Sequence, residues 1–300
     1  MKKVLLAICL IFAMLLSVSC DSKSDDTIKT VLAPNQLKVP KIFESEEASE
    51  FGTIEYTDEN AQKVKTIELF GETYSLTYKN SATIPMSDMK VHVYNYAGRE
   101  GYVYIDTETG KAVKATNIPY EEKLSTEDDY VNAISEMFGD LSQYGYKNVS
   151  THIYRFSEGG MESTDVDGFH NCAENEKFGS YKFYYQKTVG DIKTLEHLSV
   201  EFGAENTLLF ELIDLNYDTD AFHKITDNIN SFEKSTENYL KSNLKDGYKI
   251  KKLENTGIKL FTKDGVPYVS MTYEVSYISI SENNTVEFTT YVSTISRLAQ

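Results

Sequence analysis

The feature that most constrains the fold of this 300-residue chain is a strict alternation of apolar and polar residues. Across residues 269–277, apolar side chains occupy every second position, and serine, threonine and glutamate stand between them. A period of two places the two sets on opposite faces of a β-strand, so that one face is buried and the other is polar. Shorter segments with the same pattern occur at residues 73–78, 90–94 and 101–105, which predicts a chain rich in antiparallel strands.

Two segments with helical periodicity interrupt the strand pattern. The first covers residues 125–140, where Ser125 and Asp128 have the spacing of a capping box. The second covers residues 220–245, and Gly247 is placed to end it. The interval 157–179 follows neither period and is expected to be a loop. Further strands are predicted at residues 149–156, 181–188, 195–202, 208–215 and 286–295.

This order of elements predicts an α+β fold of two or three small modules, each with its own antiparallel sheet. The latter two modules are expected to pack one helix on the sheet. The predicted boundaries are a signal peptide at 1–19, an acidic tether at 20–60, a β-rich module at 61–120, and helix-plus-antiparallel-sheet modules at 121–217 and 218–300.

The first twenty residues have the parts of a secretory signal. Lys2 and Lys3 precede an apolar run, and small residues lead to Cys20. The run is shorter than the roughly 20 residues that a membrane-spanning helix needs. This order resembles the signal of bacterial lipoproteins, which implies a diacylglycerol anchor on Cys20 and a protein held at the outer face of the cell membrane. Secretion after cleavage behind Ser19 is the alternative.

Charge and cysteine content exclude several classes of function and fold. The chain has 46 acidic and 30 basic residues, a net charge of −16. This charge disfavours nucleic acid as a partner, because the phosphates would be repelled. After removal of the signal, Cys172 is the one cysteine not committed to lipid, so no intramolecular disulfide can form and the fold must depend on its core. We interpret Cys172 as a loop thiol without a catalytic partner.

Part of the chain resembles a known family. The helix at 125–140, the strand at 181–188 and the segment at 189–202 are similar to PepSY-type modules, which occur in extracytoplasmic proteins of Gram-positive bacteria. Residues 104–111, Tyr-Ile-Asp-Thr-Glu-Thr-Gly-Lys, resemble the closing hairpin of that family. The resemblance implies a protein-binding or protease-inhibiting module, with no catalytic residues to transfer.

Metal binding is the chemical function for which the sequence offers a candidate motif. Asp165 and Asp167 precede Gly168, and Glu176 is the twelfth residue counted from Asp165, as in a calcium loop. The glycine does not stand where an EF-hand requires it, so a solvated loop is favoured over a metal site formed by Asp165, Asp167 and Glu176. The sequence contains no zinc, Walker A, dinucleotide-binding or G-x-S-x-G motif.

These patterns predict a membrane-anchored extracytoplasmic lipoprotein that acts as a non-catalytic binding or protein-interaction module, without a cofactor. The expected partners are the membrane, through Cys20, and a protein at the cell surface. Sheet edges and the interval 157–179 are the contact candidates. Two alternatives stay open: a hydrolase with a carboxylate pair, which only geometry can reveal, and a small-ligand receptor, which needs a deep apolar pocket.

Overall fold

The computed structural model describes residues 28–34, 42–45, 47–121, 124–157, 160–166, 177–203, 206–280 and 286–299. The strands within these ranges are β1 (Ile28–Leu32), β2 (Glu55–Tyr56), β3 (Val64–Leu69), β4 (Glu72–Thr83), β5 (Lys90–Tyr96), β6 (Tyr102–Asp106), β7 (Ala112–Pro119), β8 (Lys147–Ser157), β9 (Gly160–Val166), β10 (Lys177–Val189), β11 (Ile192–Gly203), β12 (Thr207–Ile213), β13 (Tyr248–Lys263), β14 (Val266–Ser279) and β15 (Glu287–Leu298). The α-helices are α2 (Glu127–Phe138), α3 (His223–Thr226) and α4 (Ile229–Ser242), and short 3-10 turns cover Ser49–Phe51, Leu141–Tyr144 and Thr219–Phe222.

These strands form one hydrogen-bonded mixed sheet, so the expectation of separate small modules, each with its own sheet, is wrong. Antiparallel pairing of β12 with β7 joins the predicted module 61–120 to the module 121–217. Parallel pairing of β11 with β13, through Lys193↔Lys259 and Thr194↔Leu260, joins the latter to 218–300. The physical reason is that every strand offers the same backbone donors and acceptors at its edge, and a period of two does not say which edges meet.

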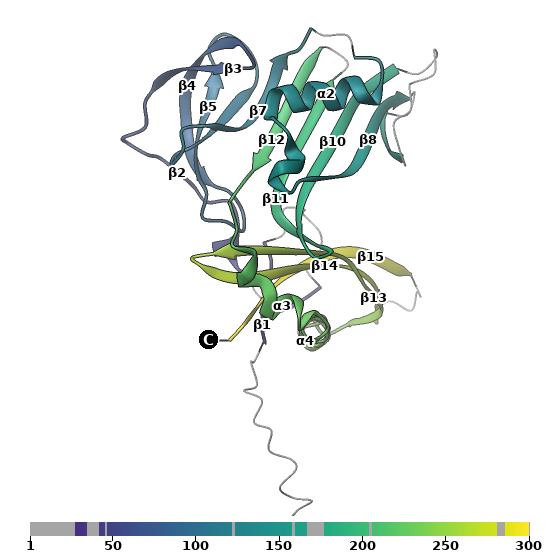
Figure 1. Ribbon diagram of the computed structural model, residues 1–300. Coiled ribbons are helices and arrows are strands. Elements are labelled where there is room, and N and C mark those ends of the chain that lie inside the picture. The colour runs from purple at the N-terminus through teal and green to yellow at the C-terminus, as the bar shows by residue number, and fades with distance from the viewer. Residues whose placement is uncertain are drawn as a thin grey trace, which may run out of the picture.

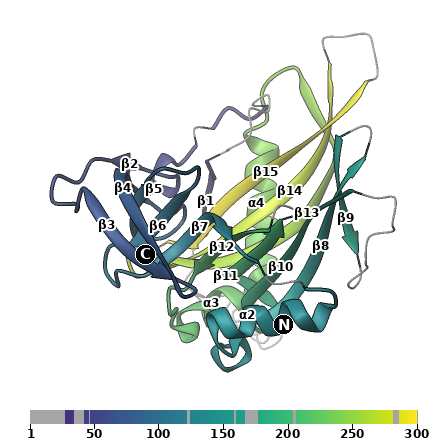
Figure 2. The ribbon, with the colours of Figure 1, turned by 90° about the horizontal axis from the view of Figure 1, so that it is seen from above.

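The helices cover the sheet at two separate places (Figure 1). Above, α2 lies across β10, β11 and β12, and its Tyr130 and Ile134 belong to one large core with Phe183, Leu198 and Phe210. Below, α3 and α4 lie beneath β13, β14 and β15. The two parts of the sheet, β2–β12 and β1 with β13–β15, are joined where β11 pairs with β13, and Figure 2 shows them overlaid when seen from above.

The one-sided pattern of residues 269–277 has the expected structural consequence. The apolar side chains of β14 pack with α4, including Phe232 and Leu240, and Val269, Met271 and Tyr273 are almost fully buried. The opposite face of β14 carries Ser270 and Thr272 and has no helix packed on it (Figure 1). This polar face forms one wall of the cleft described below.

Part of the predicted acidic tether is folded. Strand β1 pairs antiparallel with the end of β15, from Ile28↔Leu298 to Leu32↔Thr294. Ile42 and Phe43 are buried in the core that contains α4, and the Glu44 amide donates to the Asn243 carbonyl at 2.8 Å. The apolar residues of this acidic segment are therefore part of the core. The average composition of the segment, which is polar and acidic, did not predict this.

Three local expectations also need correction. The capping box of α2 is made by Thr126 and Asp129, one residue later than Ser125 and Asp128. The predicted helix 220–245 is divided into a 3-10 turn, α3 and α4, and it ends at Asn243, before Gly247. The predicted loop 157–179 contains strand β9, which forms a hairpin with β8. Periodicity places the ends of helices only within a few residues, and it did not detect β9 at all.

None of the helices in the described ranges is both long enough and apolar enough to cross a bilayer.

Candidate functional site

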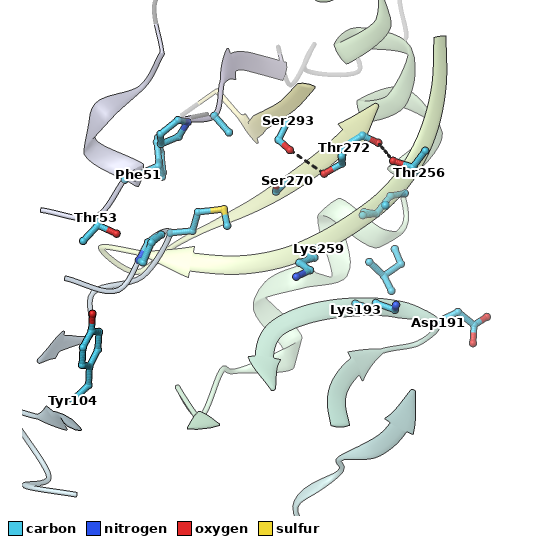
Figure 3. A pocket seen from close by; sticks show the side chains of 18 of the residues that line it. Phe51, Thr53, Tyr104, Asp191, Lys193, Thr256, Lys259, Ser270, Thr272 and Ser293 are labelled. Atoms are coloured by element: carbon cyan, nitrogen blue, oxygen red, sulfur yellow. Dashed lines mark hydrogen bonds between the residues drawn. The ribbon is translucent and has the colours of Figure 1, made fainter. Parts of the chain in front are cut away.

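A cleft of about 1330 Å³ opens between the polar face of β13–β15 and the segments that precede β2 and β5 (Figure 3). The tip of the β10–β11 hairpin closes one end of it. The lining contains hydroxyl groups, two lysines, two carboxylates and a few apolar side chains. Its members include Phe51, Thr53, Glu55, Met86, Tyr104, Asp191, Lys193, Thr256, Lys259, Ser270, Thr272 and Ser293.

Hydroxyl groups line the wall formed by β13, β14 and β15. Thr272 and Ser293 are directly opposite each other in the sheet, and their hydroxyl oxygens are 2.9 Å apart in a hydrogen bond. The Thr256 hydroxyl donates to the Thr272 carbonyl at 3.2 Å. Ser270, on the same strand face, lies opposite Lys259. The register of three antiparallel strands thus gathers side chains that are far apart in the sequence into one polar surface.

Lys193 and Lys259 lie side by side at the junction of the two parts of the sheet (Figure 3). As partners in a parallel pair they project from the same face, and adjacent strands are only about 4.8 Å apart. Burial, and after it the charge of Lys193, lower the pKa of Lys259, while Glu211 acts weakly in the other direction. Within the described residues, no ion pair to a carboxylate is formed by either lysine.

The opposite wall is held in place by aromatic packing. Phe51 makes edge contacts with Phe261 and Tyr268, at ring-centroid distances of 6.0 and 5.2 Å. The Met86 amide donates to the Phe51 carbonyl at 2.9 Å, which connects this segment to the turn before β5. Phe51 also belongs to an apolar cluster with Leu195, Ile213 and Ile295. The cleft therefore has walls built on a core shared by both parts of the sheet.

A row of paired charges lies beside the cleft on β7, β11 and β12. Lys114 Nζ is 3.1 Å from Glu211 Oε1, and His197 Nε2 is 3.7 Å from Glu211 Oε2. Burial alone raises the pKa of Glu211, but His197 and Lys114 outweigh it and lower that pKa to about 2. Lys114 also lies over the ring of Tyr104, a residue of the cleft. This carboxylate is thus held ionised and is already occupied by its protein partners.

A second, more deeply buried network holds together the strand ends behind the cleft. Lys187 Nζ contacts Glu196 at 3.2 Å and Asp214 at 2.8 Å, and the Leu215 amide donates to Glu196 at 3.0 Å. Burial raises the pKa of Glu196, and Lys187 offsets part of that effect. Because the members are bonded to one another across β10, β11 and β12, we interpret this network as structural.

Among the described residues, Glu254 and Glu274 form a carboxylate pair that can be compared with the pair a hydrolase would need. They are directly opposite each other on β13 and β14, on the same face as Thr272. Each has its own partner, because Lys252 contacts Glu254 and the Tyr291 hydroxyl donates to Glu274 at 2.7 Å. Glu254 is 52% exposed. The pair is a solvated cross-strand contact beside the cleft, and neither carboxylate lines it.

The residues singled out from the sequence do not meet in a described site. Asp165 lies in strand β9, opposite His152, and not in a loop. Asp167, Glu176, Cys172 and Cys20, the residue predicted to carry the lipid, lie outside the described residues. Among the residues that are described, no group of three or more histidine, cysteine or acidic side chains is arranged to hold a metal ion.

The two lysines of the cleft were missed by sequence reasoning. Lys259 stands between Ile258 and Leu260, so the local alternation marked it as the polar face of a strand but gave no partner for it. Lys193 follows the turn at Gly190 and reads as an ordinary exposed hairpin residue. Only the parallel pairing of β11 with β13 brings the two together.

No family model matches this chain, and no significant similarity to a curated protein or to a solved structure is found, so the cleft has to be interpreted from its own chemistry.

Proposed function

We propose that this protein is a lipid-anchored extracytoplasmic binding protein that holds its ligand in the cleft between the two parts of the sheet and carries out no reaction on it. The anchor is the diacylglycerol group on Cys20, as the resemblance of residues 1–20 to lipoprotein signals implies. The anchor places the cleft outside the cell, where the partner is either a surface protein or another component of the envelope.

One observation supports binding above the other candidates, namely the combination of an open cleft with a lining of hydroxyls and cations. Hydroxyl groups both donate and accept hydrogen bonds, and lysines supply charge, so together they recognise polar ligands. A small-ligand receptor fits less well, because the pocket of such a receptor is usually enclosed and mainly apolar. The cleft here is lined by hydroxyls and lysines.

The chemistry of the nearby acids favours binding over hydrolysis. A glycoside hydrolase needs one carboxyl group that is protonated near neutral pH and a second that is ionised. Glu211 has its pKa lowered to about 2 by His197 and Lys114, after those partners overcome the effect of burial, so it is a poor proton donor or base. Glu254 and Glu274 are each bonded to a neighbouring side chain and lie outside the lining of the cleft.

The anchor is tested by intact mass and membrane partitioning of the full chain beside its Cys20→Ala variant. We expect the native protein to carry the mass of a diacylglyceryl group and to leave the membrane only after the substitution. Release of both forms without lipid would contradict the anchor and favour a secreted protein.

The cleft is tested by photo-crosslinking in intact cells. A photoreactive p-benzoylphenylalanine replaces Tyr104, which lines the cleft, and a matched variant carries it at Tyr144, which is 61% exposed and lies outside the lining of the cleft. We expect a discrete adduct from the Tyr104 position alone. Equal labelling from both positions, or none from Tyr104, would reject the cleft as the binding site.

A further inference from the structure

We propose that the ligand of this cleft is an anionic saccharide, whose phosphate or carboxylate group binds between Lys193 and Lys259 while its hydroxyls meet the serine and threonine wall. This inference rests on the proposed function and names the chemistry of the ligand.

The first argument is the cost of placing two like charges together. Lys193 and Lys259 are direct partners in the sheet, and Lys259 is half-buried. Like charges at directly opposed positions destabilise a sheet. The acid whose charge acts on Lys259 is Glu211, which is already paired with Lys114 at 3.1 Å. An oxyanion from outside would neutralise the two ammonium groups, and it would do so in a protein whose net charge is −16.

The second argument is the chemistry of the surrounding wall. Ser270 lies directly opposite Lys259, so Lys193, Lys259 and Ser270 form one row across β11, β13 and β14. Thr272 and Ser293 form the next row along the strands. Each hydroxyl has both donor and acceptor capacity, which is the complement of a chain of sugar hydroxyls. The anion site is thus continuous with a surface suited to the rest of a saccharide.

The third argument distinguishes a saccharide from an acidic peptide. Extended peptides commonly gain affinity by adding a strand to a free sheet edge. The hydroxyl wall here is the face of β14 and β15, and β14 is paired on both edges, with β13 and with β15. The side chains of this wall, and not its backbone, are therefore available for recognition. The cleft, at about 1330 Å³, is also larger than the roughly 300–1,000 Å³ of pockets for single small ligands, which fits a chain of several sugar units.

Isothermal titration of the full chain in detergent tests the proposal. The probes are trigalacturonate, which carries carboxylates, glucose 6-phosphate, which carries a phosphate, neutral maltotriose, and a hexaglutamate peptide. The variants are Lys193→Gln, Lys259→Gln and the double substitution. Lys251→Gln is the control, because Lys251 is an exposed lysine of the same strand outside the cleft.

We expect an anionic saccharide to bind, with affinity that falls about tenfold for each lysine removed and is unchanged in Lys251→Gln. Added salt should weaken binding of the native protein more than that of the double variant. Preference for trigalacturonate or for glucose 6-phosphate would identify which oxyanion the lysines take.

Several results would overturn the inference. They are equal binding of maltotriose and the anionic saccharides, unchanged affinity in the double variant, selective binding of hexaglutamate, or no binding of either anionic saccharide. If p-benzoylphenylalanine at position 104 gives its specific adduct in cells, such a result rejects the anionic saccharide as the ligand but keeps the cleft as the binding site. Loss of that adduct would reject the cleft as a binding site.

Discussion

The two helix-covered parts of the sheet use the same layer arrangement but leave very different surfaces on their other face. Behind β11 and β12, the face opposite α2 carries charges that neutralise one another, as in the row Lys114, Glu211 and His197. Behind β13 and β14, the face opposite α4 carries hydroxyls and the unpaired Lys259. Both faces are polar by pattern, yet in the second the two lysines that line the cleft are neighbours and have no acidic partner among the described residues.

This difference teaches that the polar face of a strand can serve either stability or recognition. A carboxylate whose pKa is strongly lowered stabilises the folded state, since the native structure favours its ionised form. A lysine whose pKa is lowered by burial and by a second lysine does the opposite. The paired row is thus a structural feature, whereas the cleft lysines carry a cost that a ligand would relieve.

The largest effect is expected from removing one core ring on each side. Phe183 contacts α2 and Phe232 belongs to α4, and both are fully buried. Each change to alanine should lower the free energy of unfolding by about 3–5 kcal/mol, because it leaves a cavity. Since Phe51, Phe261 and Leu195 join the two parts in one apolar cluster, urea unfolding monitored by circular dichroism should show a single transition in both variants. Two separate transitions would mean that the parts unfold independently.

Lowering the pH should reduce the stability that the row of Lys114, Glu211 and His197 contributes. The pKa of Glu211 is lowered from 4.5 to about 2 in the folded protein. Its contribution is therefore complete above the unfolded value, and is lost as the pH falls from about 4.5 towards 2. That contribution is about 2–3 kcal/mol once its partial exposure is allowed for. Glu211→Gln should flatten this part of the curve of unfolding free energy against pH, measured by urea unfolding. Glu254→Gln is the control, because Glu254 is an exposed glutamate of β13, outside the row of Lys114, Glu211 and His197. An unchanged acid limb in Glu211→Gln would contradict the account.

The N-cap residues of α2 and α4 should differ in how much they contribute to the stability of the protein. Thr126 accepts a hydrogen bond from the Asp129 amide at 3.2 Å and completes a capping box for α2. The side chain of Asn228, at the start of α4, makes no capping hydrogen bond to that helix and donates instead to the Lys224 carbonyl at 2.9 Å. Thr126→Ala should cost about 1 kcal/mol, and Asn228→Ala less. Thermal unfolding of the two variants measures the difference, and a Thr126→Ala variant as stable as the native chain would show that the capping box does not stabilise α2.

The smallest effect, of opposite sign, is expected in the cleft. Burial and then Lys193 lower the pKa of Lys259, so its charged form is disfavoured in the folded state. Lys259→Gln should therefore raise the free energy of unfolding slightly, by about 0.5 kcal/mol. Lys114→Gln, in the paired row, should lower it. A loss of stability in Lys259→Gln would show that this lysine has a structural role.

Much of the local structure could be predicted, because it depends on neighbours in the sequence. The strand at residues 269–277 and the turn between Asp106 and Lys111 follow from periodicity and turn residues, and both occur where expected. The start of α2 was displaced by one residue, because Ser125, Thr126, Asp128 and Asp129 offer two overlapping capping boxes. Local chemistry selects the kind of element and leaves its end to packing.

The candidate site could not be predicted in the same way. Lys193 and Lys259 are separated in the sequence by most of β11, the whole of β12, a helical segment and most of β13, and nothing around either residue marks it as functional. The calcium-like spacing of Asp165, Asp167 and Glu176 was the more visible motif, yet Asp165 belongs to a strand. Short motifs show residue types at a spacing, whereas a binding surface depends on which strands become neighbours.

The sequence by itself determined the apolar face of each strand and helix and the acidic net charge, because these depend on composition and period alone. The tertiary structure decided that the strands form one sheet, that β11 lies parallel to β13, and that residues 28–32 add a strand to β15. The physical reason is that backbone hydrogen bonding is the same for every strand, so partners are selected by how distant apolar faces pack. The cleft and its two lysines are a consequence of that selection.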